Sequence, residues 1–378
     1  MEIDITKIAK ETFKDKKLII EKQKNNRVKI KYKNLIGRTS NHLSDVTLPN
    51  SIKLDVTFAE AIGLYLGDGV TSENNPWAIC YTSIDPDICK FMLDFFISKF
   101  RIPLEDIDLD IRYRFGSRKA IKKKWMCILN INRIDRIYKI KRCLSETLKI
   151  QINGIILRKM FQTIMKNSLN YISIDKDLRR GFLRGYFAAE GTISYYNKNT
   201  GTSVSSISFS YNKIKENWLR DFCMGCLKLE GINSRYEESK IKLGGKIVIC
   251  NWCNFKKMWE IGIFDRCERK KKLFVSLVRK PKVYIYLRSN FIKSISKENG
   301  MTQEKTAEFL GSTQGNISEI IRGKRPFEIT QLILLSKFLN KDIQLIKDNI
   351  TLIQIYHSST KLKPSNDFTN LLFESKLV

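Results

Sequence analysis

The chain has 378 residues, which is enough for two or three ordinary domains. A hydrophobic fraction of 43% excludes a wholly disordered protein, and 68 Lys and Arg against 39 Asp and Glu give a net charge of +29. A chain this basic usually binds a polyanion, first of all nucleic acid, although a lysine-rich composition can also serve solubility alone.

The first 150 residues predict a basic segment followed by one αββαββα unit. Residues 1–52, with a helix expected over 14–23 and an exposed strand over 27–34, could form either a DNA-clamping arm or part of the next fold. The unit itself covers residues 53–150. Its predicted elements are a helix over 57–69, a weak strand from Gly69, a strand over 77–83, a helix over 84–100 started by Asp85 before Pro86, strands over 107–115 and 124–131, and a helix over 133–148.

The same order returns after a mostly helical linker over 151–178. The second unit covers residues 179–285, and its predicted elements are a helix over 178–191, strands over 192–196 and 203–211, a helix over 214–231, strands over 234–239 and 246–250, and a helix from Asn254. A period near 120 residues favours two copies of one unit fused into a pseudo-dimer. Residues 286–345 predict a small all-helical module, and residues 346–378 a tail with no strong pattern.

Each unit begins with small residues spaced four apart and ends its first helix with an acid and a glycine. The two sets are Ala59, Gly63, Gly67, Asp68 and Gly69, and Gly181, Gly185, Ala189, Glu190 and Gly191. This spacing gives each helix a face almost without side chains, so the two helices can pack closely and end together, with the glycines as favoured C-caps.

The close pairing of the helices would bring Asp68 and Glu190 side by side. A divalent cation such as Mg²⁺ would relieve their repulsion and supports phosphodiester hydrolysis in a basic protein. One such motif alone is more typical of helix packing without chemistry. Two copies in register favour the metal site.

The runs FAEAIGLYLGDG and GFLRGYFAAEG resemble the two motifs of the LAGLIDADG homing endonucleases, and the resemblance covers about residues 53–285. It implies a single-chain pseudo-dimer with two antiparallel saddle sheets over the DNA major groove. It also implies Mg²⁺ held by Asp68 and Glu190 with Gly67 and Ala189, and cleavage of both strands across the minor groove to leave 3′ overhangs. The family uses a basic residue near the last strand of each half. Lys124 and Lys246 are the nearest matches, with Lys122 and Lys123 competing for the first position.

Alternation along two predicted strands separates an apolar face from a face that could contact DNA. In 107–115 the apolar face has Leu109, Ile111, Tyr113 and Phe115, and the polar face has Asp108, Asp110, Arg112 and Arg114; in 203–211 the polar residues are Ser206, Ser208 and Ser210. Each such residue could equally face solvent. The basic cluster of Arg118, Lys119, Lys122, Lys123 and Lys124, expected between two strands, is better suited to phosphate than to base contact.

Residues 301–340 resemble the helix-turn-helix of phage repressors. The first motif helix is expected over 302–310, Gly311 in the turn, and the second helix from Ser312 to Ile321. The resemblance would direct Thr313, Gln314 and Asn316 to the major groove. A small helical domain for protein contact is the alternative interpretation.

Cysteine and histidine usage bounds the remaining chemistry. Two histidines, His42 and His357, leave little material for a Ser-His-Asp triad or a histidine-rich zinc site. The pairs Cys223/Cys226 and Cys250/Cys253 could bind zinc, but the first pair lies on the core side of an amphipathic helix, which favours packing. No signal-peptide core or membrane-length apolar run is present, so we expect a cytoplasmic protein acting at DNA.

The sequence thus predicts an α+β protein that is a monomeric, Mg²⁺-dependent, site-specific double-strand DNA endonuclease. Two alternatives on the same fold remain open, a non-catalytic DNA-binding transcriptional regulator and an RNA-splicing maturase. The presence of both acids, Asp68 and Glu190, favours the nuclease over the regulator.

Overall fold

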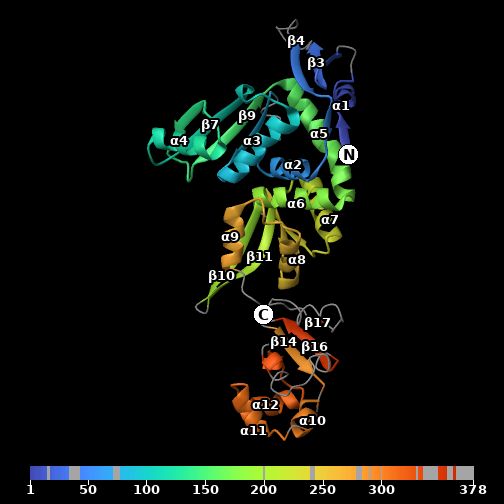
Figure 1. Cartoon of the computed structure of the whole chain (residues 1–378), viewed down its shortest axis with the longest axis vertical. Helices are drawn as coiled ribbons and strands as arrows, with labels where there is room; N and C mark the ends of the chain where they lie inside the picture. Colours follow the sequence, from blue (N-terminus) through green and yellow to red (C-terminus); the bar gives the residue numbers. More distant parts are fainter. Residues whose placement is uncertain are drawn as a thin grey trace. The chain divides into compact units, whose positions relative to one another are not determined.

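The computed structural model divides the chain into two compact units, which we call unit 1 (Met1–Leu277) and unit 2 (Val278–Val378) (Figure 1). Among the described residues, no helix is both long and apolar enough to cross a membrane. The structure describes residues 1–14, 18–33, 43–70, 77–198, 201–238, 243–277, 283–288, 291–298, 300–328, 331–334, 348–355 and 361–362.

The N-terminal segment of unit 1 is folded. Its elements are β1 (Glu2–Asp4), α1 (Ile5–Thr12), the antiparallel sheet β2 (Leu18–Gln23), β3 (Arg27–Lys33) and β4 (Leu43–Pro49), and β5 (Ser51–Lys53), which pairs with β1. The helix expected over 14–23 is wrong. Asn25 and Asn26 both have positive φ, 62° and 53°, which suits a tight hairpin turn and pairs β2 with β3. Thr12 donates a 2.9 Å hydrogen bond to Thr163, which ties α1 to the linker helix.

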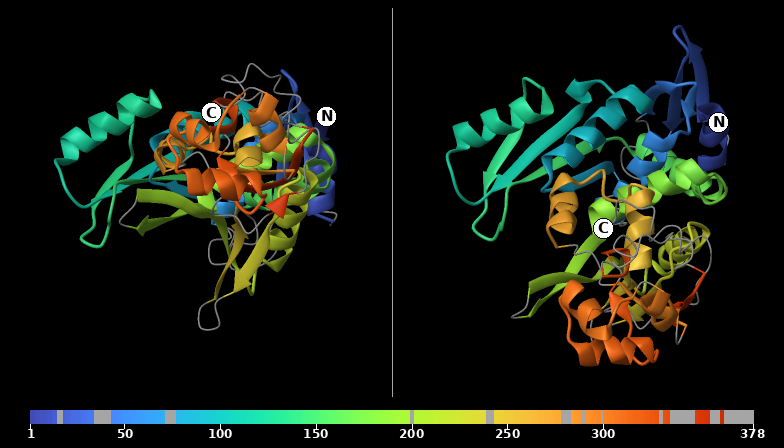
Figure 2. Two further views of the ribbon diagram at one scale, coloured as in Figure 1. Left: turned by 90° about the horizontal axis from the view of Figure 1, so that it is seen from below. Right: turned by 60° about the horizontal axis from the view of Figure 1, so that its bottom comes forward.

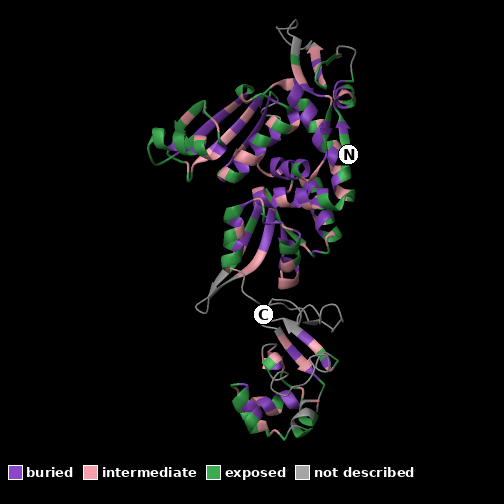
Figure 3. Cartoon of the chain, viewed as in Figure 1, coloured by how far each residue is buried: buried purple, intermediate pink, exposed green. Residues whose placement is uncertain are grey.

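Two helices that open the predicted repeats pack against each other at the centre of unit 1. A Cβ on Gly63 would lie 2.2 Å from the Phe182 carbonyl oxygen, and one on Gly185 would lie 1.9 Å from that of Glu60. Only glycine permits backbones this close, so the predicted small-residue faces do meet. Figure 3 shows buried residues along both helices. They are α2 (Val56–Asp68) and α6 (Lys176–Glu190).

One buried carboxylate links the two halves beside this helix pair. Glu60 is 2% exposed and accepts from Arg266 at 2.6 Å, with Arg184 at 3.5 Å. A buried carboxylate needs such partners, because its desolvation is costly when it is left unpaired. Both arginines come from the second half of unit 1, so this contact depends on the correct pairing of the halves.

The two four-stranded sheets of unit 1 lie on either side of the α2–α6 pair (Figures 1 and 2). The first sheet has the order β6-β9-β7-β8, and the second has the order β10-β11-β13-β12. All neighbours are antiparallel except β7 and β8, which are parallel. The strands are β6 (Ala78–Ser83), β7 (Ile107–Tyr113), β8 (Arg136–Lys139), β9 (Thr147–Asn153), β10 (Gly191–Lys198), β11 (Gly201–Asn212), β12 (Arg235–Glu238) and β13 (Gly244–Ile249).

Helices cover the sheets much as the sequence predicts. The first half has α3 (Pro86–Phe100), whose N-cap is Asp85 with proline at the first position, as expected. The linker is the single helix α5 (Ile155–Ile174). The second half has α7 (Asn217–Leu229), α8 (Trp252–Glu260) and α9 (Glu268–Leu277). The weak strand expected from Gly69 is described only to Val70, where Gly69 bridges Tyr81, and the rest of it lies outside the described residues.

The first half contains an insertion that the second half lacks. The strand expected over 124–131 is wrong, because these residues end α4 (Arg118–Leu129). Ile121, Trp125 and Leu129 are buried at a spacing of four, which is the period of a helix face. The helix expected over 133–148 is also wrong, because this segment contains β8 and the start of β9. The segment of α4 and β8 therefore lies between β7 and β9, where β12 passes directly to β13 in the other half.

Unit 2 combines helices with a sheet, so the expectation of an all-helical module is wrong. The two motif helices do match their predicted positions. Strands from both ends of the unit pair in the order β15-β14-β16-β17, a long-range pairing that local patterns do not reveal. The elements are α10 (Phe291–Glu298), α11 (Gln303–Phe309), α12 (Gln314–Ile321), β14 (Val283–Leu287), β15 (Phe327–Glu328), β16 (Ile350–Ile355) and β17 (Lys361–Leu362). Their core includes Ile285, Leu310, Ile317, Phe327 and Ile353.

Candidate active site

The acidic ends of α2 and α6 meet at one end of the helix pair. A Cβ on Gly67 would lie 2.4 Å from the Ala189 Cβ and 3.1 Å from the Glu190 Cγ. Asp68 is the last residue of α2 and Glu190 the last of α6, and both are partly buried. The packing of the small residues therefore brings the two carboxyl groups to the same place.

Burial raises the pKa of both carboxyl groups. The pKa of Asp68 rises to about 6 because burial penalises its charge, an effect that nearby Lys270 opposes and Asp85 reinforces. The pKa of Glu190 rises to about 7, first through burial and then through the negative charge of Asp68. Two carboxylates held this way repel each other, and a cation between them would favour the ionised form of both.

The site offers the oxygen ligands that a hard divalent cation prefers. Each carboxylate is next to the backbone carbonyl of a small residue, Gly67 or Ala189, and the end of a helix leaves such carbonyls without an intrahelical partner. In the described part of the chain, no group of three or more His, Cys, Asp or Glu side chains could hold a metal ion. Water and a substrate phosphate would have to complete any coordination.

The glycines that follow the acids have a steric role. Gly69 and Gly191 are the C-caps of α2 and α6, as the sequence predicts, and their φ values of −79° and −69° are extended, not left-handed. A Cβ on Gly69 would lie 2.3 Å from the Tyr65 carbonyl oxygen, and one on Gly191 would lie 2.3 Å from that of Phe187. Glycine is required because the chain turns sharply into a strand against its own helix.

Lys270 of α9 also reaches the site, although no sequence pattern selects it. It is 7% exposed, and its Nζ donates to the carbonyl oxygens of Phe187, Ala188 and Ala189 at 3.0, 2.6 and 3.0 Å. Burial lowers the pKa of Lys270. In the run ERKKK this lysine looks like its solvated neighbours. The one local signal is its spacing of four from Phe274, which is also buried.

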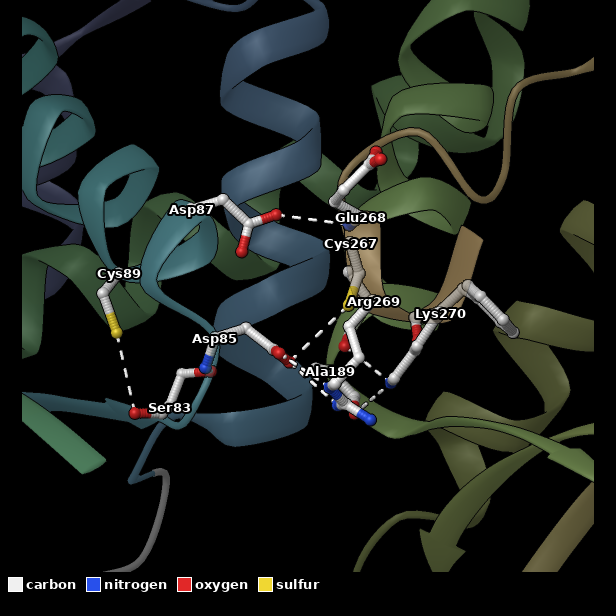
Figure 4. A network of polar contacts seen from close by, with 11 residues as sticks. Ser83, Asp85, Asp87, Cys89, Ala189, Cys267, Glu268, Arg269 and Lys270 are labelled. Carbon is white, nitrogen blue, oxygen red and sulfur yellow. Dashed lines mark hydrogen bonds and ion pairs between the residues drawn. The ribbon is translucent and has the colours of Figure 1, made fainter. Parts of the chain in front are cut away.

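An ion pair fixes the start of α9 against the first half (Figure 4). Arg269 donates to both carboxylate oxygens of Asp85 at 2.8 and 2.9 Å, and the Cys267 thiol lies 3.5 Å from the same carboxylate. Although burial opposes it, the hydrogen bonds and charge of Arg269 hold the pKa of Asp85 below its usual range. The network holds α9, and with it Lys270, in place.

The strand register relates the two halves residue by residue. Gly69, which follows Asp68, bridges Tyr81 of β6, and Gly191, which follows Glu190, pairs with Phe209 of β11. Tyr81 and Phe209 are therefore equivalent positions, and the strands that carry them can be aligned without reference to side chains.

This register identifies a lysine that sequence reasoning missed. The residues after Tyr81 and Phe209 are Thr82 and Ser210, which pair with Lys149 of β9 and Lys246 of β13. Lys149 is thus the counterpart of Lys246 in the last strand of the first half. Lys124, the residue expected there, lies on α4 and forms a 2.9 Å ion pair with Glu146. Lys122 and Lys123, the competing matches, also lie on α4.

The predicted DNA-facing side chains differ in exposure. Along β7, Arg112 is exposed, whereas Asp110 is 8% exposed; Arg114 is exposed beyond the end of the strand. Phe115, expected on the apolar face, is 72% exposed. Leu109, Ile111 and Tyr113 are buried, so the predicted apolar face of the strand is correct, whereas Asp110 on the opposite face is buried as well.

Of the three serines of β11 that were predicted to face DNA, two are partly exposed and one is buried. Ser206 and Ser210 are partly exposed. Ser208 is 2% exposed, and its hydroxyl has no hydrogen-bond partner among the described residues. The structure therefore does not expose Ser208 for a direct contact.

The basic cluster lies on α4 rather than between two strands. Arg118, Lys119, Lys122, Lys123 and Lys124 are all exposed. Since only Ile121, Trp125 and Leu129 of this helix are buried, the remaining surface of the insertion is strongly positive.

In unit 2, the predicted contact residues lie at the start of α12. Thr313 is its N-cap and accepts from the backbone N–H of Asn316 at 3.3 Å. Thr313 and Gln314 are exposed, while Asn316 is partly exposed and accepts a hydrogen bond from Arg325. The N-terminal end of this helix therefore presents polar side chains.

The cysteine pairs occupy different environments. Cys223 and Cys226 are buried on α7, and burial raises the pKa of Cys226 to about 12. Cys250 and Cys253 are partly buried at the start of α8. A high pKa keeps a thiol protonated, whereas zinc binding needs the thiolate.

Two family models match separate parts of the chain. Residues 177–261 match the family model of a LAGLIDADG-like domain, and residues 292–346 match that of a helix-turn-helix. No curated protein sequence matches the chain. Similar solved structures include I-DmoI in complex with DNA and Ca, at 13% identity and a TM-score of 0.29 over 55% of this chain and 88% of that chain. They also include full-length WhiA from Thermatoga maritima, at 14% identity and a TM-score of 0.36 over 78% of this chain and 89% of that chain.

Proposed function

We propose that this protein is a site-specific DNA endonuclease that hydrolyses phosphodiester bonds on both strands, leaving 3′ overhangs. One observation carries the proposal: Asp68 and Glu190 end two helices that pack through glycine backbones, and the pKa of each carboxyl is raised. A fold that only needed helix packing would have no use for two partly buried acids at the joined ends, because their repulsion destabilises it.

Asp68 and Glu190, with the carbonyls of Gly67 and Ala189, would hold divalent cations, of which we propose Mg²⁺. When bound, such ions polarise the phosphate and lower the pKa of an attacking water. The two carboxylates fix the place where this chemistry happens. Lys149 and Lys246 stand at equivalent positions in the two last strands, and we assign them to orient water on either side of the site.

The remaining charge of unit 1 suits binding of DNA. Arg112 and Arg114 and the serines Ser206 and Ser210 present hydrogen-bonding groups suited to base edges. The exposed lysines of α4 suit phosphates, whose contacts bring affinity without sequence preference. In unit 2, the match to a helix-turn-helix model supports DNA contact by the start of α12, which would lengthen the target or tether the enzyme.

A cleavage selection tests the proposal. The full chain is incubated with a random duplex library and Mg²⁺, and the cut ends are sequenced. The wild type should enrich one target and leave 3′ overhangs. Asp68→Asn and Glu190→Gln should each lower the rate by ~100-fold or more and leave binding in a gel-shift assay nearly unchanged. Glu260→Gln is the control, because Glu260 is exposed and forms a surface ion pair with Lys256, one turn earlier in α8.

The outcomes separate the nuclease from its alternatives. A double variant, Asp68→Asn with Glu190→Gln, that still cuts at the wild-type rate excludes the assignment of the acids. A wild type that binds one duplex tightly but never cuts it with Mg²⁺ or Mn²⁺ indicates a regulator. Acceleration of intron splicing without DNA cleavage indicates a maturase.

A further inference from the structure

The second half of the acidic site contains a cation that belongs to the protein. The Lys270 Nζ contacts three carbonyl oxygens, those of Phe187, Ala188 and Ala189. Three acceptors require three N–H donors, which only the protonated ammonium has. All its donors are used, so this charge is fixed and has no proton left to direct at water.

The Lys270 ammonium donates to the Ala189 carbonyl oxygen, which a divalent cation would need as a ligand. The packing of Gly67 against Glu190 brings the Gly67 backbone beside that carboxylate. By the two-fold relation of α2 and α6, the Ala189 carbonyl is the corresponding ligand beside Asp68. The Ala189 carbonyl accepts from Lys270 at 3.0 Å, whereas no donor among the described residues contacts that of Gly67.

The two ends of the site are therefore unequal. A divalent cation at the Ala189 carbonyl would lie close to a fixed positive charge and would compete with it for the same lone pairs. The Asp85–Arg269 ion pair holds the start of α9 in position, and with it the backbone from which Lys270 reaches the site.

We infer that Lys270 replaces one of two divalent cations, so that the chain holds a single ion, beside Glu190 and the Gly67 carbonyl. This inference rests on the proposed function and refines it. The enzyme would then use one metal-loaded centre and one ammonium-loaded centre, and it would cut one DNA strand before the other. A lysine that merely caps the C-terminus of α6 would instead affect stability alone.

Counting bound ions tests the inference without an activity assay. Mn²⁺ is titrated into the full chain, and free Mn²⁺ is measured by electron paramagnetic resonance. The wild type should bind one ion, and Lys270→Met should bind two. Lys270→Gln keeps an amide that can donate to the carbonyls and should also bind two, which guards against a folding defect in the first variant. The matched control is Lys271→Met, because Lys271 is the next residue of α9 and pairs with Asp265 at the surface.

Several results would overturn the inference. The inference is wrong if the wild type binds two ions or none. It is also wrong if the wild type and the folded Lys270 variants all bind one ion. If neither variant folds, the wild-type count decides. A second readout is strand order on the selected target: wild type should nick one strand ~10-fold faster than the other, and Lys270→Gln should reduce this ratio. A wild type that binds two ions and still cleaves rejects the inference but leaves the nuclease intact, whereas the absence of any cleavage rejects the nuclease itself.

Discussion

Lys149 and Lys246 occupy the same register position in the last strands of the two sheets, opposite Thr82 and Ser210. Lys149 is partly buried and donates to the side chain of Gln151, whereas Lys246 is exposed. The equivalence comes from backbone pairing alone, and it replaces Lys124 as the first-half candidate.

Replacing either strand lysine by methionine should slow DNA cleavage. We expect Lys149→Met and Lys246→Met each to lower the rate by ~100-fold, the lower end of what a positioned proton-transfer group contributes. Lys124→Met is the comparison: because Lys124 lies on α4 and suits phosphate contact, its replacement should weaken binding but leave the rate at saturating enzyme within ~3-fold. The measurement is nicking of each labelled strand. A large effect at Lys124 with none at Lys149 would show that the register argument is wrong.

The glycines of the helix pair should not tolerate a methyl group. Gly63→Ala would place a Cβ 2.2 Å from a carbonyl oxygen, so we expect a decrease of ~3 kcal/mol or more in the free energy of unfolding. Gly225→Ala on α7 has nothing within 4 Å and should stabilise by ~0.5–1 kcal/mol. Urea denaturation of both variants measures the change in the free energy of unfolding. Equal, small effects would mean that the helices are not in backbone contact.

The acid pair should make the metal-free protein less stable as pH rises. Unfolded carboxyls titrate near pH 4. The folded pKa values of Asp68 and Glu190 are raised to about 6 and 7, so the folded state binds more protons in this interval. The free energy of unfolding should therefore fall from pH 4 to pH 7 through these groups and then level off.

The matching variants remove this dependence. At pH 8, Asp68→Asn and Glu190→Gln should each stabilise the protein by ~1–2 kcal/mol, because one pKa unit is worth ~1.4 kcal/mol and partial exposure screens part of it. Denaturation in EDTA across this pH range is the measurement. Asp85 does not interfere, because its pKa is lowered and it titrates below the window. A wild-type curve parallel to that of the double variant would contradict the raised pKa values.

The exposed lysines of α4 should set part of the salt dependence of DNA binding. Replacing Lys119, Lys122 and Lys123 by glutamine should reduce the slope of log K against log salt by ~0.9 for each DNA phosphate that the variant no longer neutralises. Lys228→Gln on α7 is a control with the same charge change per substitution and should leave the slope unchanged. An unaltered slope in the triple variant would mean that the insertion does not touch DNA.

The sequence predicted the second half of unit 1 better than the first, for a physical reason. From α6 to α8, each element follows local period and capping, and every predicted strand and helix is present. In the first half, α4 and β8 interrupt the repeat, and a partner strand remote in sequence determines β8. An alignment of the two halves from sequence alone therefore places the last strand of the first half too early in the chain, on residues of α4. It selects Lys124 of α4 in place of Lys149 of β9.

The sequence alone predicts the acids of the site but not its buried lysine. Asp68 and Glu190 are visible because the glycine spacing fixes where each helix ends. Lys270 is invisible, because its role comes from three carbonyls on another helix, and nothing local distinguishes it from Lys271 or Lys272. The burial of Ser208 likewise depends on neighbouring elements and not on the alternation of β11.

The buried Glu60 also determines which halves can associate. By the alignment of the motif helices, Glu60 and Ile62 of α2 correspond to Phe182 and Arg184 of α6. If two like halves associated, so that α2 met the α2 of a second chain, Glu60 would face Ile62 in place of Arg184 and would be separated from Arg266 as well. A desolvated carboxylate without a cation costs several kcal/mol. The ion pair therefore disfavours the association of two first halves and favours the pairing of a first half with a second half.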